Sequence, residues 1–275
     1  MASDFTRIGA NIPAMQSLNS FNLINKQIAE RQLRLATGKR INSAGDDPAG
    51  FQLSELMDSR ARGLQVAFDN VSNAQNLLNV AEGGYQNIMD ILQTAKEKAT
   101  QAADGLYSSA QRTALNDQVS ALIAEVDDIV SEATFNGSTL IDGSYSNQSF
   151  QTGETASDTL AITLVGADSA DLSINAVSLA TQASASAAMS TINTAITTLA
   201  QRIQDVGEYK ARLNSKEGTL SVAVTNTEAV RSTIEDADFA REQMEMMKLQ
   251  IVQQTALSSL TNSNSSPQLV LSLFQ

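Results

Sequence analysis

The sequence predicts a mainly α-helical protein, an elongated helical bundle or coiled coil with a small β-hairpin insert. Of its 275 residues 42% are hydrophobic but only 4% are aromatic, and none is Trp. Apolar content that is mostly Ala, Leu, Ile and Val suits long helices packed through narrow seams better than an aromatic-rich core. Apolar residues also recur at steps of three and four along several stretches, whereas one internal stretch alternates as strands do.

The first helical pattern covers about Thr6 to Ala36. We expect Gly38 to end it, because glycine commonly takes the left-handed conformation just past a helix end. Lys39 to Asp46 forms a connector, and Asp47-Pro48 starts the next helix, since an Asp side chain can accept from a free first-turn amide and Pro fits the first helical position. The apolar side chains of the first pattern include Ile8, Ile12, Met15, Leu18, Phe21, Ile24, Ile28 and Leu35.

The second helix, from Pro48 to about Ala103, has the most regular pattern in the chain. Its apolar residues alternate steps of three and four without a slip, which is typical of a coiled-coil seam. These residues are Val71, Ala74, Leu78, Ala81, Tyr85, Ile88, Leu92 and Ala95.

A third helix follows the Asp104-Gly105 break. Ser108 with Gln111 resembles a capping box, and we expect Asn136-Gly137 to end the helix. The seam is repeated by Leu115, Val119, Leu122, Val126 and Ile129. From Ser138 to about Leu179 the chain becomes rich in Thr, Ser and Gly with alternating apolar residues, which indicates short strands and turns.

The helical period then returns for the rest of the chain. Its apolar positions are Met189, Ile192, Ile196, Leu199, Ile203 and Val206, followed less regularly by Leu213, Leu220 and Ile234 and by a last stripe of Met244, Met247 and Ile251. The inner three helices can share one bundle, but the two outermost helices are left over. A pair of them buries only a narrow seam, so neighbouring copies would cover the remaining apolar surface, and head-to-tail stacking of copies gives an open helical polymer.

Composition excludes several kinds of chemistry. Without His or Cys the chain lacks the usual neutral-pH general base, a thiol nucleophile and thiolate metal ligands, so we expect no enzyme, metal site or cofactor. Gly45-Asp46-Asp47 offers too few oxygen ligands for calcium and is better explained as a helix cap. The net charge of -12, concentrated between about Arg62 and Thr181, disfavours nucleic-acid binding. No window has the roughly 18 apolar residues of a membrane span, and the first residues do not form a conventional cleavable signal.

Five segments resemble bacterial flagellin, in family order and with family-like spacing. They are Gln32 to Gly50 (QLRLATGKRINSAGDDPAG), Thr134 to Gly137 (TFNG), Ile234 to Phe239 (IEDADF), Ile251 to Gln254 (IVQQ) and Pro267 to Phe274 (PQLVLSLF). The resemblance covers both end regions of the chain. Only about forty residues separate Gly137 from Thr181, so the sequence resembles a short flagellin without large outer domains.

The resemblance implies a secreted, extracellular subunit that polymerises into the flagellar filament for motility. Its terminal helices would pair in a separate coiled coil in the polymer and line a channel, and export would use the flagellar type III apparatus. The implied partners are further copies, an export chaperone, the filament cap and the hook-filament junction proteins. The implied ranges are an N-terminal inner-core helix (1–41), N-terminal rod helices (42–137), a small β region (138–182), a C-terminal rod helix (183–233) and a C-terminal inner-core helix (234–275).

The implied self-assembly residues are the eight apolar positions of the first pattern, the two connector carboxylates and the apolar positions of the last segment: Asp46, Asp47, Met244, Met247, Ile251, Leu269, Leu271, Leu273 and Phe274. The family's surface for the flagellin-sensing Toll-like receptor aligns with Leu92 to Gln101, where the equivalent residues are Thr94, Glu97 and Lys98. Stimulatory flagellins carry Arg and Leu at the first and last of these positions. We therefore expect weak innate immune receptor recognition.

Three alternatives remain at the level of the sequence. A flagellin-related hook-filament junction protein would share the Asp46-Asp47-Pro48 loop, although the segment IEDADF, IVQQ and the VLSLF-like end favour flagellin. A chemoreceptor-like signalling rod would show similar heptads, but it should add a membrane span or sensor domain. An enzyme is the least favoured, because no pocket with paired carboxylates is indicated.

Overall fold

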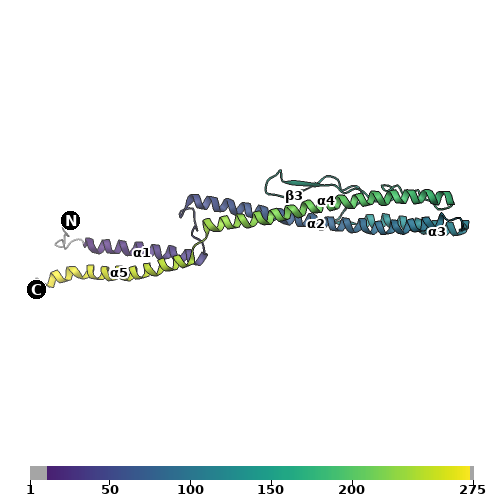
Figure 1. Cartoon of the computed structure of the whole chain (residues 1–275). Helices are drawn as coiled ribbons and strands as arrows, with labels where there is room; N and C mark the ends of the chain where they lie inside the picture. Colours follow the sequence, from purple (N-terminus) through teal and green to yellow (C-terminus); the bar gives the residue numbers. More distant parts are fainter. Residues whose placement is uncertain (1–10, 273–275) are drawn as a thin grey trace. The chain divides into compact units, whose positions relative to one another are not determined.

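The computed structural model describes residues 11–272, with side chains from 11 to 265. The chain divides into two compact units (Figure 1). Unit 1 contains Met1–Ser59 and Asn226–Gln275, and unit 2 contains Arg60–Thr225.

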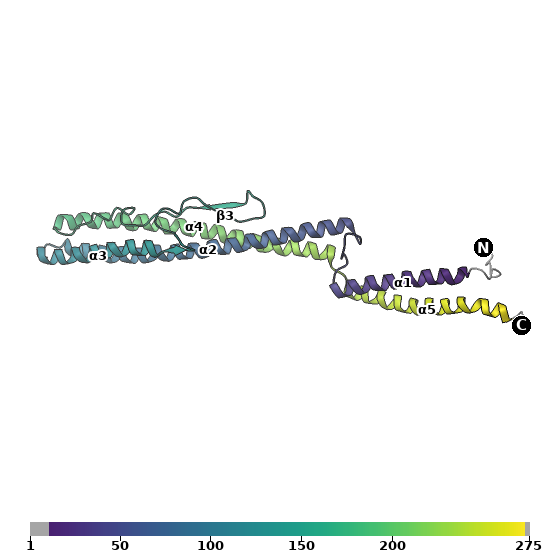
Figure 2. The same cartoon turned by 180° about the vertical axis from the view of Figure 1, so that it is seen from behind.

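Unit 1 is built on two helices from opposite ends of the chain, α1 (Ile12–Thr37) and α5 (Phe239–Ser272). They run side by side and antiparallel (Figures 1 and 2). The N-cap Asn11 accepts from the Ala14 amide at 3.1 Å. Gly38 ends α1 in the left-handed conformation, with φ of 72°. Glycine adopts this conformation readily, whereas an L side chain there would be strained. This end is as predicted, whereas the expected start at Thr6 lies outside the described residues.

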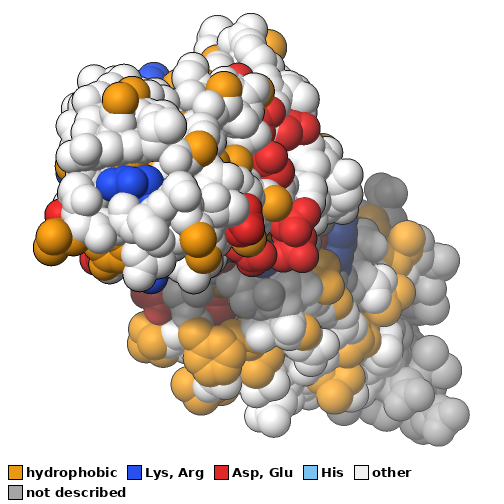
Figure 3. Space-filling model, turned by 90° about the vertical axis from the view of Figure 1, so that its right-hand side faces the viewer, with side chains coloured by type: hydrophobic (Ala, Val, Ile, Leu, Met, Phe, Trp, Pro, Cys, Tyr) orange, Lys and Arg blue, Asp and Glu red, His pale blue; other side chains and the backbone are white. Residues whose placement is uncertain are grey.

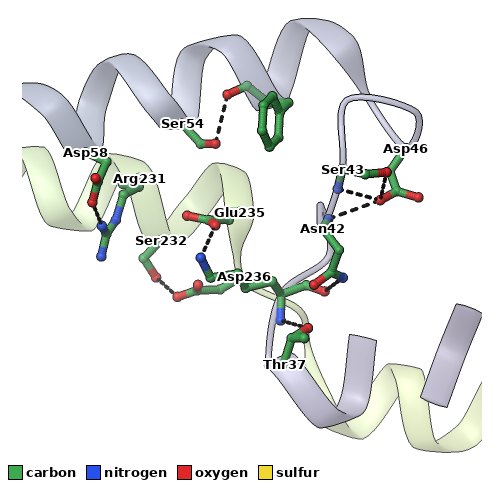
Figure 4. A network of polar contacts seen from close by, with 12 residues as sticks. Thr37, Asn42, Ser43, Asp46, Ser54, Asp58, Arg231, Ser232, Glu235 and Asp236 are labelled. Atoms are coloured by element: carbon green, nitrogen blue, oxygen red, sulfur yellow. Dashed lines mark hydrogen bonds and ion pairs between the residues drawn. The ribbon is translucent and has the colours of Figure 1, made fainter. Parts of the chain in front are cut away.

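Within unit 1, the segment that joins α1 to α2 (Pro48–Ala102) pairs with the segment that joins α4 (Gln182–Glu235) to α5. Lys39 and Asp236 form an antiparallel bridge, and the Arg40 amide donates to the Glu235 carbonyl at 2.6 Å. The Ser232 hydroxyl donates to the Asp236 carboxylate at 2.5 Å (Figure 4). The bond from the Arg40 amide satisfies a carbonyl that the end of α4 leaves free, and the Ser232–Asp236 bond joins two side chains.

Unit 2 packs α2 from Arg60 onward against α3 (Ser109–Glu132) and α4 up to Thr225 (Figure 1). The predicted seam of the second helix is confirmed, since all eight of its side chains are at most 2% exposed. From the third helix Leu115, Val119 and Val126 are buried, and from the fourth Ile192, Leu199, Val206, Leu213 and Leu220 are buried. The core of this unit is therefore a run of aliphatic layers along three helices.

The start of α3 is confirmed, but the predicted end is wrong. Ser108 and Gln111 form the capping box, with Gln111 accepting from the Ser108 amide at 2.9 Å. The helix already ends at Glu132. Asn136-Gly137 is instead the two-residue turn between β1 (Thr134–Phe135) and β2 (Ser138–Thr139), with φ of 49° and 81°. Asn-Gly favours this hairpin turn because both central residues need positive φ.

The expected β insert contains a second antiparallel pair, β3 (Gln148–Gln151) and β4 (Thr159–Ile162). Leu160 and Ile162 are buried, as the alternation of the sequence predicts. The chain after β4 is fastened to the helices by Tyr85, which donates to the Val165 carbonyl at 2.6 Å, and by Arg202, which donates to the Gly166 carbonyl. Burial raises the pKa of Tyr85, so its hydroxyl stays a neutral donor.

Candidate functional site: self-assembly surfaces

A buried carboxylate joins the two terminal helices of unit 1. Glu242, in the first turn of α5, is 6% exposed. Its oxygens accept from Arg31 Nη1 at 2.7 and 2.6 Å, and Arg34 Nη1 lies 3.6 Å from the same carboxylate. The carboxylate also lies where a helix dipole favours negative charge. Because an unpaired buried charge is costly, this cluster favours one register between the two helices.

Further polar contacts follow the same antiparallel pairing. Gln253 Nε2 donates to Asn25 Oδ1 at 2.6 Å, and Asn11 Nδ2 donates to the Ser263 carbonyl at 2.9 Å. The apolar seam between these contacts is narrow. Of the predicted apolar residues of α1, only Ile28 is buried, while Phe21, Ile24 and Leu35 are half-buried. One α1–α5 pair therefore leaves much of its apolar surface uncovered.

Six of the predicted apolar assembly residues are exposed in unit 1. On α1 they are Ile12, Met15 and Leu18, and on α5 they are Met244, Met247 and Ile251. The most exposed of them, Ile251, leaves 66% of its surface uncovered. Large exposed apolar side chains in this number on one helix pair are typical of an interaction surface.

Unit 1 also exposes apolar residues that the sequence analysis did not single out. Further exposed apolar side chains are Leu23 and Leu33 on α1, Leu53 and Leu56 on α2, Val230 on α4, and Phe239, Val252 and Leu257 on α5. The Arg31–Glu242 cluster was also missed. The i, i+3 spacing of Arg31 and Arg34 was visible in the sequence, but nothing local indicated an acidic partner near the other end of the chain.

The connector carboxylates have local structural roles. Asp46 accepts from the Asn42 amide at 3.1 Å and from the Ser43 amide at 3.0 Å (Figure 4). These bonds, first that of Asn42, lower the pKa of Asp46. Asp47 accepts from the Gly50 amide at 3.0 Å and caps α2 at Pro48. The Asp47 bond agrees with the interpretation of this loop as a helix cap.

Five predicted assembly residues have side chains outside those that the structure describes. Ile8, Leu273 and Phe274 lie outside the described residues. Leu269 and Leu271 lie within the backbone of α5, and their side chains are not among those described.

The receptor-equivalent residues lie on α2 in unit 2. Thr94 and Glu97 are exposed and Lys98 is half-buried. The Thr94 hydroxyl donates to the Asp90 carbonyl of its own helix at 3.0 Å. At this position the side chain therefore directs its hydrogen toward the helix and offers no fork of donors.

Acidic side chains dominate the surface chemistry of unit 2. Residues 60–225 contain 18 Asp and Glu against 9 Lys and Arg. Acidic side chains gather along one side of the surface in Figure 3, where hydrophobic ones are scattered.

Among residues 11–272 no group of His, Cys, Asp or Glu is placed to hold a metal ion. Within the same range no helix is apolar over the length needed to cross a bilayer.

The fold and this surface define a class of protein: a helical subunit whose terminal helices expose apolar faces suited to association with other copies. Two family models match the chain, the bacterial flagellin N-terminal helical region over residues 8–146 and the bacterial flagellin C-terminal helical region over residues 189–274.

Known proteins similar to the chain support the same family. Flagellin FlaB1 of Treponema pallidum (strain Nichols) is 34% identical over 98% of this chain and 99% of its own length. The flagellin of Bacillus subtilis (strain 168) is 31% identical over 98% of this chain and 100% of its own length. A solved protein from Vibrio parahaemolyticus, described as flagellar hook-associated, superposes with a TM-score of 0.59 at 12% identity over 70% of this chain and 100% of that one. At that identity the likeness shows the fold alone.

The chain belongs to the bacterial flagellin family and is a structural subunit of the flagellar filament. The chain aligns with these relatives over nearly the whole length of both proteins. The prediction of a short flagellin without large outer domains is therefore confirmed. The comparisons do not favour a hook-filament junction protein over a flagellin. The family is structural rather than enzymatic, and its members polymerise into filaments.

Proposed function

We propose that the exposed apolar faces of α1 and α5 are the surfaces by which this flagellin assembles. The observation that carries the proposal is the exposure of Ile12, Met15 and Leu18 on one helix and of Met244, Met247 and Ile251 on the other. Covering the part of such a side chain that is still exposed stabilises an assembly by about 1 to 2 kcal/mol. Neighbouring copies would supply the cover, and Ile8, Leu269, Leu271, Leu273 and Phe274 would take part in the same assembly.

The proposed roles follow the family's organisation. Residues 1–41 and 234–275 form inner-core helices around a channel, 42–137 and 183–233 form rods of the surrounding wall, and 138–182 form a small β region. The connector with Asp46 and Asp47 contacts neighbouring copies. Membership of the flagellin family is what supports these roles.

Family membership also supports the proposed cellular setting. The chain is exported through the flagellar type III apparatus with an export chaperone, assembles beneath the filament cap onto hook-filament junction proteins, and acts outside the cell. It performs no catalysis of its own. Recognition by the flagellin-sensing Toll-like receptor is weak, because Thr94 lacks the donors of an Arg and Lys98 introduces a charge in place of an apolar contact.

Deletion of Leu269 to Gln275 tests the assembly proposal. We expect a chain that keeps its helical circular dichroism but stays monomeric in sedimentation under conditions in which the full chain forms filaments. Filaments of normal yield and length from the truncated chain would refute it.

Single substitutions locate the surface within the described residues. Ile251→Ser should raise the critical concentration for polymerisation by roughly tenfold or more, since an exposed apolar side chain loses its cover in the polymer. The matched control is Val222→Ser, which changes a 61% exposed side chain on α4 in unit 2. An equal effect of the two changes would mean that exposed apolar residues in general matter, not this surface.

A further inference from the structure

Among the residues whose side chains are described, exposed methionines occur on the two terminal helices alone. Seven of the eight methionines of the chain lie in this range. Met15 on α1 is 62% exposed, and Met244 and Met247 on α5 are 61% and 50% exposed. The remaining four are half-buried, and they are Met57, Met89, Met189 and Met246. The exposed methionines therefore lie on the helices by which we propose that the chain assembles.

The composition of the chain makes methionine its main target for an oxidant. The chain has no Cys and no Trp, so methionine holds all of its sulfur. Hydrogen peroxide, a two-electron oxidant, converts the thioether to a sulfoxide. The S–O bond forms as the O–O bond of the peroxide breaks, the sulfur is oxidised by two electrons, and the peroxide leaves as water. Because the oxidant must reach the sulfur, the exposed methionines should react before the half-buried ones.

The sulfoxide has a polar oxygen on a side chain that was flexible and apolar. In the single chain an exposed sulfoxide keeps its hydrogen bonds to water, so it costs the fold little. In an assembly the neighbouring copy removes that water, and a polar group that is buried without a hydrogen bond destabilises the buried state. Oxidation at an exposed methionine therefore disfavours assembly more than it disfavours the folded chain.

The polar contacts that hold α1 against α5 do not use the exposed methionines. Glu242 accepts from Arg31, and Gln253 donates to Asn25. In the apolar seam the buried side chain of α1 is Ile28. The pairing of the two helices within one chain can therefore survive oxidation of the three exposed side chains.

We propose that Met15, Met244 and Met247 are oxidation sites that control assembly, and that their sulfoxides keep the chain unassembled. The proposal rests on the proposed function, because it needs these side chains to be covered in the polymer. Oxidation acts on chains before they join, since covered thioethers are out of reach. A methionine sulfoxide reductase reverses it: the oxygen leaves as water while two thiols are oxidised to a disulfide.

Peroxide treatment of the monomeric full-length chain tests the proposal. The readout is the critical concentration after treatment divided by that of the same chain before treatment. For the unmodified chain we expect a ratio of roughly ten or more, with unchanged helical circular dichroism. The combined variant Met15→Leu, Met244→Leu and Met247→Leu should give a ratio of about one, because leucine has a similar volume and no sulfur. Equal ratios for the two chains would overturn the proposal.

The matched control replaces two half-buried methionines. Met89 on α2 and Met189 on α4 pack against the core of unit 2. Met89→Leu combined with Met189→Leu removes two sulfur atoms from that unit, and we expect it to keep the peroxide sensitivity of the unmodified chain. Loss of sensitivity in this control equal to that in the combined variant would also overturn the proposal.

A second measurement uses the unmodified chain alone. Monomer is partly oxidised and then polymerised, and mass spectrometry gives the sulfoxide content of each methionine in the filaments and in the unpolymerised fraction. Sulfoxide at Met15, Met244 and Met247 should be enriched in the unpolymerised fraction, and treatment of that fraction with sulfoxide reductases and a thiol should restore its polymerisation. Equal sulfoxide contents at these positions in the two fractions would contradict the proposal.

Oxidation of finished filaments separates this proposal from the proposed function. If neighbouring copies cover the three side chains, their oxidation should be slower in filaments than in monomer. Oxidation at the rate of the monomer would contradict the proposed function. Slow oxidation in filaments, together with normal polymerisation of fully oxidised chains, would leave that function intact and overturn the control of assembly by oxidation.

Discussion

Glu242 accepts two hydrogen bonds from Arg31, at 2.7 and 2.6 Å, although 211 residues separate the two along the chain. The contact joins the first turn of α5 to the second half of α1 within unit 1. The Glu242 carboxylate is nearly inaccessible to solvent, whereas the Arg31 side chain is 30% exposed. The pair therefore acts at the edge of the seam, where it can specify register at a smaller desolvation cost than a fully buried pair.

Glu242→Gln should weaken the pairing of α1 with α5. The amide keeps the shape but loses the charge, leaving Arg31 and Arg34 without their shared partner, and a cost of about 1 to 3 kcal/mol is expected. The measurement is the temperature at which purified filaments depolymerise, followed by light scattering. The matched control is Glu245→Gln, one turn along, whose exposed pair with Lys248 at 3.5 Å should contribute little. Equal shifts for the two variants would contradict the role given to Glu242.

Gly83 and Gly84 provide a matched pair in the middle of α2. A Cβ on Gly83 would meet nothing within 4 Å, so Gly83→Ala should stabilise the helix by up to about 1 kcal/mol through propensity alone. A Cβ on Gly84 would lie 2.8 Å from Ile141 Cδ1, and Ile141 is fully buried. Gly84→Ala should therefore be less stable than Gly83→Ala by about 1 to 3 kcal/mol. Urea unfolding followed by circular dichroism measures both, and equal midpoints would show that the α2 contact to Ile141 is loose.

Asp46 should titrate at lower pH in the folded chain than in the unfolded chain. The Asn42 amide, with Ser43, bonds its charged form and lowers its pKa from the ordinary value of 3.8. The stabilisation is therefore fully present above that value and is lost as pH falls through the lower, folded pKa. Carbon NMR of chain labelled in its aspartate carboxyls, with Asp46→Asn to assign the signal, measures both midpoints. A folded midpoint at or above the urea-unfolded one would contradict the bonding seen in the loop.

Receptor potency should respond to the residues at positions 94 and 98. Monomeric chain is expected to stimulate receptor reporter cells weakly, and Thr94→Arg combined with Lys98→Leu should raise the potency. Thr94→Ser with Lys98→Arg, which preserves the chemistry of both positions, is the control. Full potency of the unmodified chain would show that other contacts on α2 compensate for the missing guanidinium.

Much of unit 2 was predictable because its signals are local. The seam from Val71 to Ala95 follows the helical period without interruption, and every one of its side chains is buried. The capping box at Ser108 and, in unit 1, the left-handed Gly38 are likewise decided within a few residues of chain. Asn136-Gly137 shows the limit of such reasoning. Its positive φ values were to be expected, but whether they end a helix or turn a hairpin depends on the strands beside them.

The helical period, the caps, the β insert and, through its motifs, the family can all be read from the sequence. Which apolar residues of the terminal helices are covered within the chain, and which remain exposed, is seen in the structure alone. It placed Ile28 in the seam and left Ile251 outside it, and it joined Glu242 to Arg31. The physical reason is that periodicity records which residues share a face of one helix, whereas the register between two helices depends on contacts between residues far apart in the chain.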